Sequence, residues 1–238
     1  ADRQWGSGGA INYKQEGIRT INAMKAANFR STGEQYMPQN VSRTSDYMIG
    51  HFRAFKAATG DGFWDLAISR SAQLVTTIVN GYSPSARLTP GFIYDPAGTP
   101  RPDTIARVDG SGVEGIYDQN AVRNPWRWGT DYVWTGDATW GKFARDINAT
   151  LKADCGGNPS QTCYQYNLNG TGASVRYFST TACGGMLVGA MCDANQQSWV
   201  NQIFSQGSTV GGGFGTAYYE SELILLPLIV ASGNWWRP

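Results

Sequence analysis

The 238-residue sequence contains little charge and a single histidine. Charged residues make up 16% of it, and 19 basic residues nearly balance 18 acidic ones without forming a Lys/Arg cluster, so we expect no nucleic-acid partner. Because His51 stands alone, a multi-histidine metal site is excluded, and we expect neither a metal nor a cofactor. The longest uninterrupted apolar run, 223–231, has nine residues and is too short to span a bilayer, so we expect no membrane partner.

Motifs of nucleophilic and nucleotide chemistry are also missing. There is no GxSxG motif and no P-loop, and the glycine run 211–213 lacks the preceding strand that a phosphate-binding loop needs. His51 lies in a helical stretch beside Phe52 and Arg53, which favours a structural histidine over a catalytic one. A Ser-His-Asp triad therefore has little support.

Aromatic residues and glycine are abundant instead. The chain holds 9 Trp, 12 Tyr, 9 Phe and 30 Gly residues. A surface that is rich in aromatic rings and poor in charge suits a neutral, ring-shaped ligand better than a charged one.

The four cysteines, Cys155, Cys163, Cys183 and Cys192, form no CxxC pair. Their even number and close spacing predict two disulfides, and Cys155–Cys163 with Cys183–Cys192 is the simplest of three pairings; four reduced, buried thiols are the alternative. We expect a secreted, extracellular protein. Neither a signal peptide nor an initiator Met is visible, so we expect a processed or truncated product.

Helical periodicity dominates the chain. Residues 140–151 carry an apolar stripe at helical spacing, and further helices are expected over 63–79 and 220–231. Ser45 is predicted to cap a helix that carries Met48, Phe52 and Phe55 on one side. Alternating strand patterns are scarce, and residues 88–116 are predicted to form a long loop, of the kind that is usually functional.

A short pattern of glycine, Asp or Asn, and an aromatic residue recurs along the chain. It is found in 59–64 and 135–140, again at 232–236, and more loosely at 192–199. Glycine ends one helix in the left-handed conformation, and the Asp or Asn caps the next helix. Repeated αα-hairpins without strands favour a helical toroid, with an irregular helical bundle as the alternative.

The acidic residues are candidates for sugar cleavage, which needs two carboxyl groups. Glu16 and several aspartates are explained as solvated or capping residues, whereas the long loop holds acids without an evident structural task. The densest segment, 114–127, combines Glu114 and Asp118 with two arginines and Trp126. Arginine can hold a sugar hydroxyl or a carboxylate, and Trp offers a flat apolar face to a sugar ring. The alternative is that this segment is the start of a helix, with Asp118 as its cap.

At these residues the chain resembles glycoside hydrolase family 8, the inverting endoglucanases, licheninases, chitosanases and xylanases. The resembling segments span nearly the whole chain and follow the order that they have in the family. No single segment is specific for the family, but together they are. They are Ala1-Asp2-Arg3-Gln4-Trp5-Gly6-Ser7 with 11–13, Ser42-Arg43-Thr44-Ser45-Asp46-Tyr47-Met48 with 51–55, Asn120-Ala121-Val122-Arg123-Asn124-Pro125-Trp126-Arg127 with 130–132, and Tyr218-Tyr219 with 232–234.

The resemblance implies an all-α fold, an (α/α)6 barrel that is incomplete at its N-terminus, with residues 1–238 forming one catalytic domain. The family's general-acid glutamate and a sugar-binding aspartate have no counterpart in this sequence. Where endoglucanase-like members carry the catalytic Asp, this chain has Asn120, which cannot act as a base. A loop acid then takes that role, Glu114 as first choice and Asp118 as second.

The implied activity is inverting, endo-acting hydrolysis of a β-1,4-linked polysaccharide, either cellulose or mixed-linkage β-glucan. A chitosanase of the same family and a non-catalytic carbohydrate-binding barrel are the alternatives. The expected partners are a polysaccharide or oligosaccharide and the N-terminal segment of the same barrel, and we expect a monomer. The resemblance assigns substrate contacts to Asp46, Tyr47, Asn120, Arg123, Trp126, Tyr218 and Tyr219.

Overall fold

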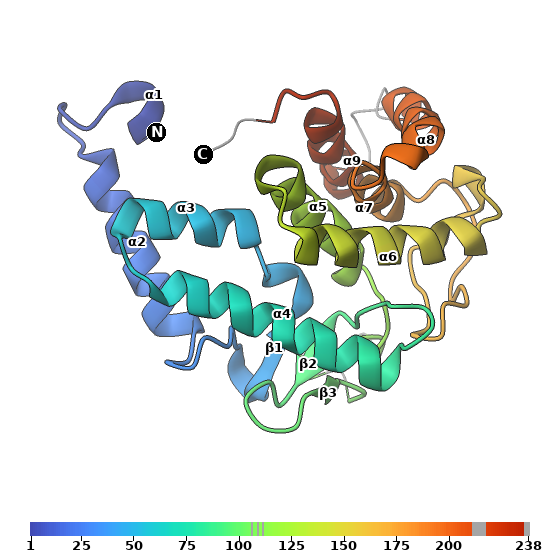
Figure 1. The fold of residues 1–238 in the computed structure, drawn as a ribbon, viewed down its shortest axis with the longest axis horizontal. Coiled ribbons are helices and arrows are strands. Elements are labelled where there is room, and N and C mark those ends of the chain that lie inside the picture. Colours follow the sequence, from blue (N-terminus) through green and yellow to red (C-terminus); the bar gives the residue numbers. More distant parts are fainter. Residues whose placement is uncertain (106, 109, 111, 211–217, 236–238) are drawn as a thin grey trace.

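The structure is a computed structural model that describes residues 1–105, 107–108, 110, 112–210 and 218–235. The described residues are mostly helical, and successive helices follow one another across the molecule (Figure 1). The helices are α1 (Asp2–Trp5), α2 (Tyr13–Asn28), α3 (Ile49–Thr59), α4 (Phe63–Tyr82), α5 (Asn124–Thr135), α6 (Ala138–Asp154), α7 (Thr180–Ala190), α8 (Gln197–Val210) and α9 (Tyr218–Ala231).

The helices form two rows. Helices α3, α5, α7 and α9 lie side by side in that order, while α4, α6 and α8 each pack against the helix that precedes them (Figure 1). The result is three consecutive αα-hairpins followed by α9, with α2 packed against α3. This is the repeated hairpin arrangement that the glycine pattern predicts.

Two of the three hairpin turns contain the predicted glycine and aspartate. Gly60 and Gly136 end α3 and α5 with φ angles of 70° and 74°, in the left-handed region that favours glycine. Asp61 Oδ1 accepts a hydrogen bond from Phe63 N at 2.9 Å, and Asp137 Oδ1 accepts one from Thr139 N at 3.0 Å. Each aspartate therefore satisfies a backbone donor that the first turn of the next helix leaves free.

The start of α3 differs from its prediction, because Ser45 does not cap it. Ser45 is buried in a short 3-10 helix, η2 (Thr44–Asp46), and α3 begins at Ile49 without a side-chain cap. The Ser45 carbonyl instead accepts a hydrogen bond from Arg127 Nη1 on α5. The Ser45 carbonyl is thus held by a long-range contact, while its hydroxyl makes no hydrogen bond within the described residues.

Residues 88–116 also differ from their prediction as a structureless loop. They contribute two strands of a small antiparallel sheet with the order β1-β2-β3, formed by β1 (Val41–Arg43), β2 (Phe92–Tyr94) and β3 (Arg101–Pro102). Strand β1 pairs with β2 in the register Ser42↔Ile93. The sheet therefore attaches this acidic segment to the chain just before α3.

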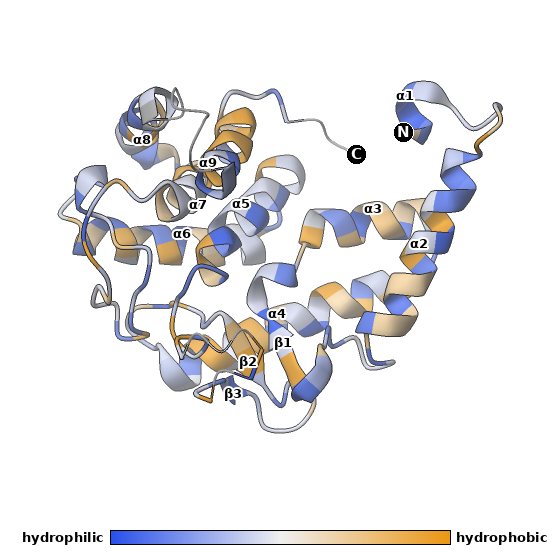
Figure 2. Ribbon diagram, turned by 180° about the vertical axis from the view of Figure 1, so that it is seen from behind, coloured by the Kyte–Doolittle hydropathy of each residue, from blue (hydrophilic) through white to orange (hydrophobic). Residues whose placement is uncertain are grey.

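The core consists of the inward faces of the hairpins and is rich in aromatic rings. Phe52 and Trp64 lie against Phe29 at centroid distances of 5.5 and 5.4 Å. The predicted apolar stripe of α6 is buried, and burial of each large side chain contributes about 1.5–3 kcal/mol. Figure 2 shows apolar residues on α7 and α9, whose apolar residues lie all around the helix. The buried stripe comprises Trp140, Phe143, Ala144, Ile147 and Leu151.

An ion pair joins the first two hairpins. Arg53 on α3 donates from Nε and Nη2 to the two carboxylate oxygens of Asp131 on α5, at 2.9 and 3.1 Å. Its Nη2 also donates to Asp137 Oδ2 at 2.7 Å. Asp131 is fully buried.

The predicted disulfides are wrong, because all four cysteines are free and buried. Each sulfur has a different neighbour, so the two sulfurs of a predicted pair do not meet. Cys155 Sγ lies 3.3 Å from Lys152 O, Cys163 Sγ 3.3 Å from Ser174 O, Cys183 Sγ 3.5 Å from Thr162 Oγ1, and Cys192 Sγ 3.6 Å from Val188 O. The alternative of reduced, buried thiols is the one that the structure shows.

The described residues show no feature of a membrane-spanning or metal-binding protein chain of the following two kinds. Their helices include none with the length and hydropathy that crossing a membrane would require. They also contain no group of three or more His, Cys, Asp or Glu side chains that could hold a metal ion.

Candidate functional site

Several polar residues lie close to one another near the N-terminal turn of α5. We define the arginine cluster as Arg43, Asp46, Asn120, Arg123 and Arg127. Arg43 Nε donates to both carboxylate oxygens of Asp46 at 3.0 Å. Arg123 ends the short helix η3 (Ala121–Arg123), and its Nη2 donates to Asn120 Oδ1 at 2.6 Å. The 3-10 helices η2 and η3 thus bring together residues that lie some 75 positions apart in the chain.

The arginine cluster carries net positive charge in a partly dry environment. Burial lowers the pKa of Arg123, and burial together with the charge of Arg123 lowers the pKa of Arg127 to about 10. Asp46 offsets part of this repulsion. Arg127 Nε is buried and has no hydrogen-bond partner among the described residues. The cluster therefore offers an unused donor that a hydroxyl or carboxylate oxygen would satisfy.

Asp118 has a structural task that accounts for its carboxylate. Its Oδ1 accepts hydrogen bonds from Asn120 N and Ala121 N at 2.9 and 3.0 Å, and its Oδ2 accepts one from Asn120 Nδ2 at 3.0 Å. Its side chain is 1% exposed. Asp118 caps η3 and orients Asn120, so the capping alternative holds at this position.

Glu114 is buried as well. Its residue is 0% exposed, and its Oε1 accepts a hydrogen bond from Val108 N at 2.9 Å. The cavities described below are lined by neither Glu114 nor Asp118. Neither base candidate therefore lines these two cavities, and Glu114 Oε1 and Asp118 Oδ1 each accept hydrogen bonds from backbone donors nearby in the chain.

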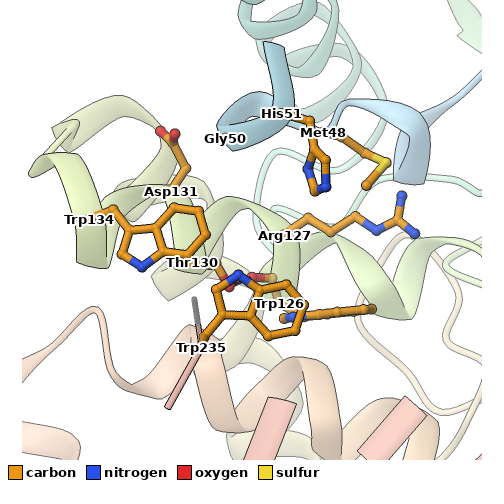
Figure 3. A pocket seen from close by; sticks show the side chains of 9 residues that line it. All are labelled: Met48, Gly50, His51, Trp126, Arg127, Thr130, Asp131, Trp134 and Trp235. Atoms are coloured by element: carbon orange, nitrogen blue, oxygen red, sulfur yellow. Dashed lines mark hydrogen bonds between the residues drawn. The ribbon is translucent and has the colours of Figure 1, made fainter. Parts of the chain in front are cut away.

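A cavity of about 120 Å³, the tryptophan pocket, lies beside the arginine cluster. Figure 3 shows Arg127 between Trp126 on one side and His51 with Met48 on the other. The Trp126 and Trp235 rings meet edge to face at 6.2 Å, and the Arg127 guanidinium lies 5.6 Å from the Trp126 ring. The lining residues are Met48, Gly50, His51, Trp126, Arg127, Thr130, Asp131, Trp134 and Trp235.

Sequence reasoning missed most of this pocket. Trp126, Thr130 and Trp134 recur at intervals of four residues, which puts them on one face of a helix, so their spacing contained the signal. His51, which the sequence favours as a structural histidine, is an exposed residue that lines the pocket. Trp235 comes from the chain after α9, and no local pattern could have placed it there.

A second cavity of about 180 Å³, the tyrosine pocket, is lined by Gln119, Tyr164, Tyr177, Thr181, Tyr219 and Glu220. Tyr219 also acts on the pKa of Arg123, so this pocket adjoins the arginine cluster. Of its lining residues, only Tyr219 was a predicted substrate contact.

Two other predicted tyrosine contacts are placed differently. Tyr47 is wholly buried, and its hydroxyl lies 2.9 Å from Ser42 Oγ, so it packs in the core and its predicted substrate contact stays a prediction. Tyr218 is 79% exposed, and a hydrogen bond to Glu222 raises its pKa. Asp46, Asn120, Arg123, Trp126 and Tyr219 are the predicted residues that the structure does bring together.

Comparison with known proteins shows which proteins the chain is similar to. No protein-family model matches the chain. A β-glucanase of Niallia circulans is 34% identical over 99% of the chain, and an endoglucanase of Bacillus sp. strain KSM-330 is 31% identical over all of it. The chain spans 59% and 51%, respectively, of these two relatives.

Solved structures show the same arrangement of helices. The apo β-1,3-1,4-glucanase of Paenibacillus sp. X4 matches the whole chain with a TM-score of 0.91 and 35% identity, and the chain covers 64% of it. A cold-adapted family 8 xylanase matches with a TM-score of 0.76 at 21% identity, which indicates a shared fold only. The expected fold, part of a barrel of αα-hairpins, is therefore confirmed over the residues that the chain spans.

Proposed function

Because the chain is a family 8-like glycoside hydrolase in both sequence and fold, we propose that it hydrolyses a β-glucan that contains β-1,4 links. The observation that carries the proposal is the arginine cluster together with the two aromatic pockets. The activity is proposed for the protein that also contains the family's general-acid glutamate, which has no counterpart in residues 1–238.

In the proposed mechanism, one water displaces the leaving sugar in a single step and inverts the anomeric carbon. Arg123 and Asn120 are already hydrogen-bonded to each other, and they would orient the reacting sugar through its hydroxyl groups. The indole of Trp126 would hold an adjacent ring by apolar contact. Because these side chains are held before substrate arrives, little ordering entropy remains to be lost on binding.

For the general base we propose Glu114. The supporting facts are the resemblance, the amide at position 120, and the hydrogen bonds of Asp118, whose Oδ1 caps η3 and whose Oδ2 accepts from the Asn120 side chain. Since Glu114 is buried, the proposal requires that water reach its carboxylate when the glycan is bound. Asp46 is the competing candidate, because its side chain is partly exposed within the arginine cluster.

Charge favours a neutral glucan over chitosan. The arginine cluster contains three guanidinium groups and one carboxylate, so it would repel the ammonium groups of chitosan. The near-zero net charge of the chain adds no long-range attraction for a cationic polymer. We therefore propose mixed-linkage β-glucan or a cellulose chain as the substrate, with secretion as the matching location.

The test is a reducing-sugar assay of the full-length enzyme on mixed-linkage β-glucan, carboxymethylcellulose and chitosan, with NMR detection of the first anomer released. We expect activity on the two glucans and an inverted anomer. Glu114→Gln should lower kcat by about 10²–10⁴-fold without changing the melting temperature greatly. Asp118→Asn should instead reduce stability and spare most of kcat. If Asp118→Asn or Asp46→Asn removes turnover while Glu114→Gln does not, the base assignment is wrong.

The competing function is carbohydrate binding without turnover, which the amide at Asn120 favours. Calorimetry with cello-oligosaccharides, run beside the reducing-sugar assay, separates the two. Binding by a full-length protein that releases no sugar ends would replace our proposal with this one.

A further inference from the structure

Asp103 lies in the segment 88–116, outside the arginine cluster and both aromatic pockets. Its residue is 1% exposed, and a buried carboxylate is costly unless it is paired. Its partner is Arg107, whose Nη1 donates to Asp103 Oδ1, while Ile105 N donates to the same oxygen at 3.2 Å. Because the side chain of Arg107 is only 20% exposed, the ion pair is largely shielded from water and holds Arg107 in place.

The Arg107 guanidinium is also held against an aromatic ring. It lies 3.9 Å from the centroid of the Tyr94 ring on β2, which is a cation–π contact. Strand β2 is paired with both β1 and β3, so the ring belongs to a fixed part of the fold. Arg107 is therefore tied to two anchors, the Asp103 carboxylate and the Tyr94 ring.

The residue that follows Arg107 contacts the proposed general base. Val108 N donates to Glu114 Oε1 at 2.9 Å. The N–H of Val108 belongs to the planar peptide group that joins it to Arg107. The placement of Arg107 therefore helps to set where this donor points, and with it the orientation of the Glu114 carboxylate.

Asp103 and Glu114 are both attached to β2 by their backbones. Asp103 N donates to Phe92 O, and Phe92 N donates to Glu114 O, each at 3.0 Å. A Cβ on Gly115 would lie 2.8 Å from Asp103 O, so the two segments are in close contact there. With these backbones fixed, the contacts of Arg107 and Val108 are what act on the Glu114 side chain.

We propose that Arg107 is a positioning residue for the hydrolytic step. Its contacts with Asp103 and Tyr94 hold the Val108 N–H at the place from which it orients the Glu114 carboxylate. This inference rests on the proposed function, in which Glu114 acts as the general base. A base must lie within hydrogen-bond reach of the attacking water, and a misplacement of about 1 Å can lower the rate about 100-fold. Arg107 acts on the reaction only through Glu114.

The test measures kcat and KM of Arg107→Gln and Asp103→Asn in the full-length enzyme on mixed-linkage β-glucan. Each variant should lower kcat about 10–100-fold and leave KM nearly unchanged, because the contact affects the reacting geometry and not the binding of the glycan. Arg107→Lys keeps a cation near Asp103 and should recover part of kcat. Arg101→Gln is the matched control and should keep the wild-type kcat. It removes the same charge 4.4 Å from the same Tyr94 ring, but Arg101 is exposed and donates to Thr99 O.

A double-mutant cycle decides whether the effect passes through Glu114. In the Glu114→Gln background, Arg107→Gln should lower kcat no further, since the group that it positions is gone. A further fall by the same factor as in the wild-type background overturns the proposal and leaves the glucanase intact, and so does a wild-type kcat in both Arg107→Gln and Asp103→Asn. If Arg107→Gln does not fold, Asp103→Asn, which keeps the shape of the side chain, takes its place in the cycle.

Failure of the proposed function gives a different pattern. If wild type cleaves glucan and Glu114→Gln keeps its turnover, the base assignment is wrong and the positioning role falls with it. If wild type cleaves no glucan, the same cycle is measured as the free energy of unfolding by urea titration. Non-additive effects of Arg107→Gln and Glu114→Gln then support the positioning contact, and additive effects overturn it.

Discussion

The pKa of His51 depends on its surroundings in the tryptophan pocket. His51 lines this pocket, where desolvation lowers its pKa and the charge of Arg127 lowers it further. Because the folded-state pKa lies below the unfolded one, the folded chain binds this proton less readily. The contribution to stability is present above about pH 6.5 and is lost as the pH falls through the folded pKa.

Replacement of Arg127 tests this coupling. We expect the His51 pKa, followed by NMR of the ring protons, to lie below the usual 6.5 and to rise in Arg127→Gln, with burial keeping it from recovering fully. As the sequence contains one histidine, its signals need no assignment. Arg19→Gln, which removes an exposed charge on α2, is the control and should leave the pKa unchanged. An unchanged pKa in Arg127→Gln would contradict the placement of the two side chains.

The cysteines give a second prediction at the residue scale. Burial raises the pKa of Cys183 and of Cys192 to about 12, so neither thiol is ionised near neutral pH. A colorimetric thiol reagent should therefore react slowly with the native protein and should titrate four thiols in guanidinium chloride without a reductant. Fewer than four thiols in the denatured protein would restore the disulfide prediction.

At the scale of elements, the hairpin turns depend on glycine. Gly136 has a φ of 74°, and a Cβ added there would meet nothing within 4 Å, so only backbone strain opposes a side chain. Gly136→Ala should lower the free energy of unfolding by about 1–2 kcal/mol, measured by urea titration. Gly62→Ala is the control, since Gly62 has a φ of −64° and open space; it should be neutral or slightly stabilising. Equal effects of the two changes would show that the left-handed turn is not what glycine supplies.

The elements also show where prediction from sequence stops. The turns at Gly60 and Gly136 were predictable because their chemistry lies within six consecutive residues. The strands of the small sheet have three, three and two residues, too few for an alternating pattern to be recognised. Ser45 is a good cap by residue type, but its burial beneath Arg127 was decided by a helix that begins about 80 positions later.

For the whole molecule, close packing around α7 decides how the hairpins assemble. A Cβ on Gly184 would lie 2.4 Å from Leu223 O of α9, and one on Gly185 would lie 2.1 Å from Val122 O of η3. Both contacts are with backbone, which cannot move aside as a flexible side chain can. Glycine at these positions therefore lets α7 approach α9 and the segment that carries the arginine cluster.

Gly185→Ala should consequently destabilise the protein by about 1–3 kcal/mol and should also weaken glycan binding, because η3 must shift. Gly81→Ala, near the end of α4 where a Cβ would meet nothing, is the control and should stabilise the protein by about 0.5–1 kcal/mol. The checks are urea unfolding and calorimetry with an oligosaccharide. Wild-type stability in Gly185→Ala would show that α7 does not pack as closely as described.

The sequence alone determined what depends on neighbours in the chain: the helices with apolar stripes, the glycine-aspartate turns, and the residue types at Asn120 and Arg123 that carry the family resemblance. Tertiary structure decided which of those side chains meet. It buried Tyr47, gave Asp118 a capping task, kept the four thiols apart, and assembled two aromatic pockets from distant segments. The reason is physical: a local pattern specifies the conformation of its own segment, whereas burial and pairing depend on which surfaces the packed helices leave uncovered.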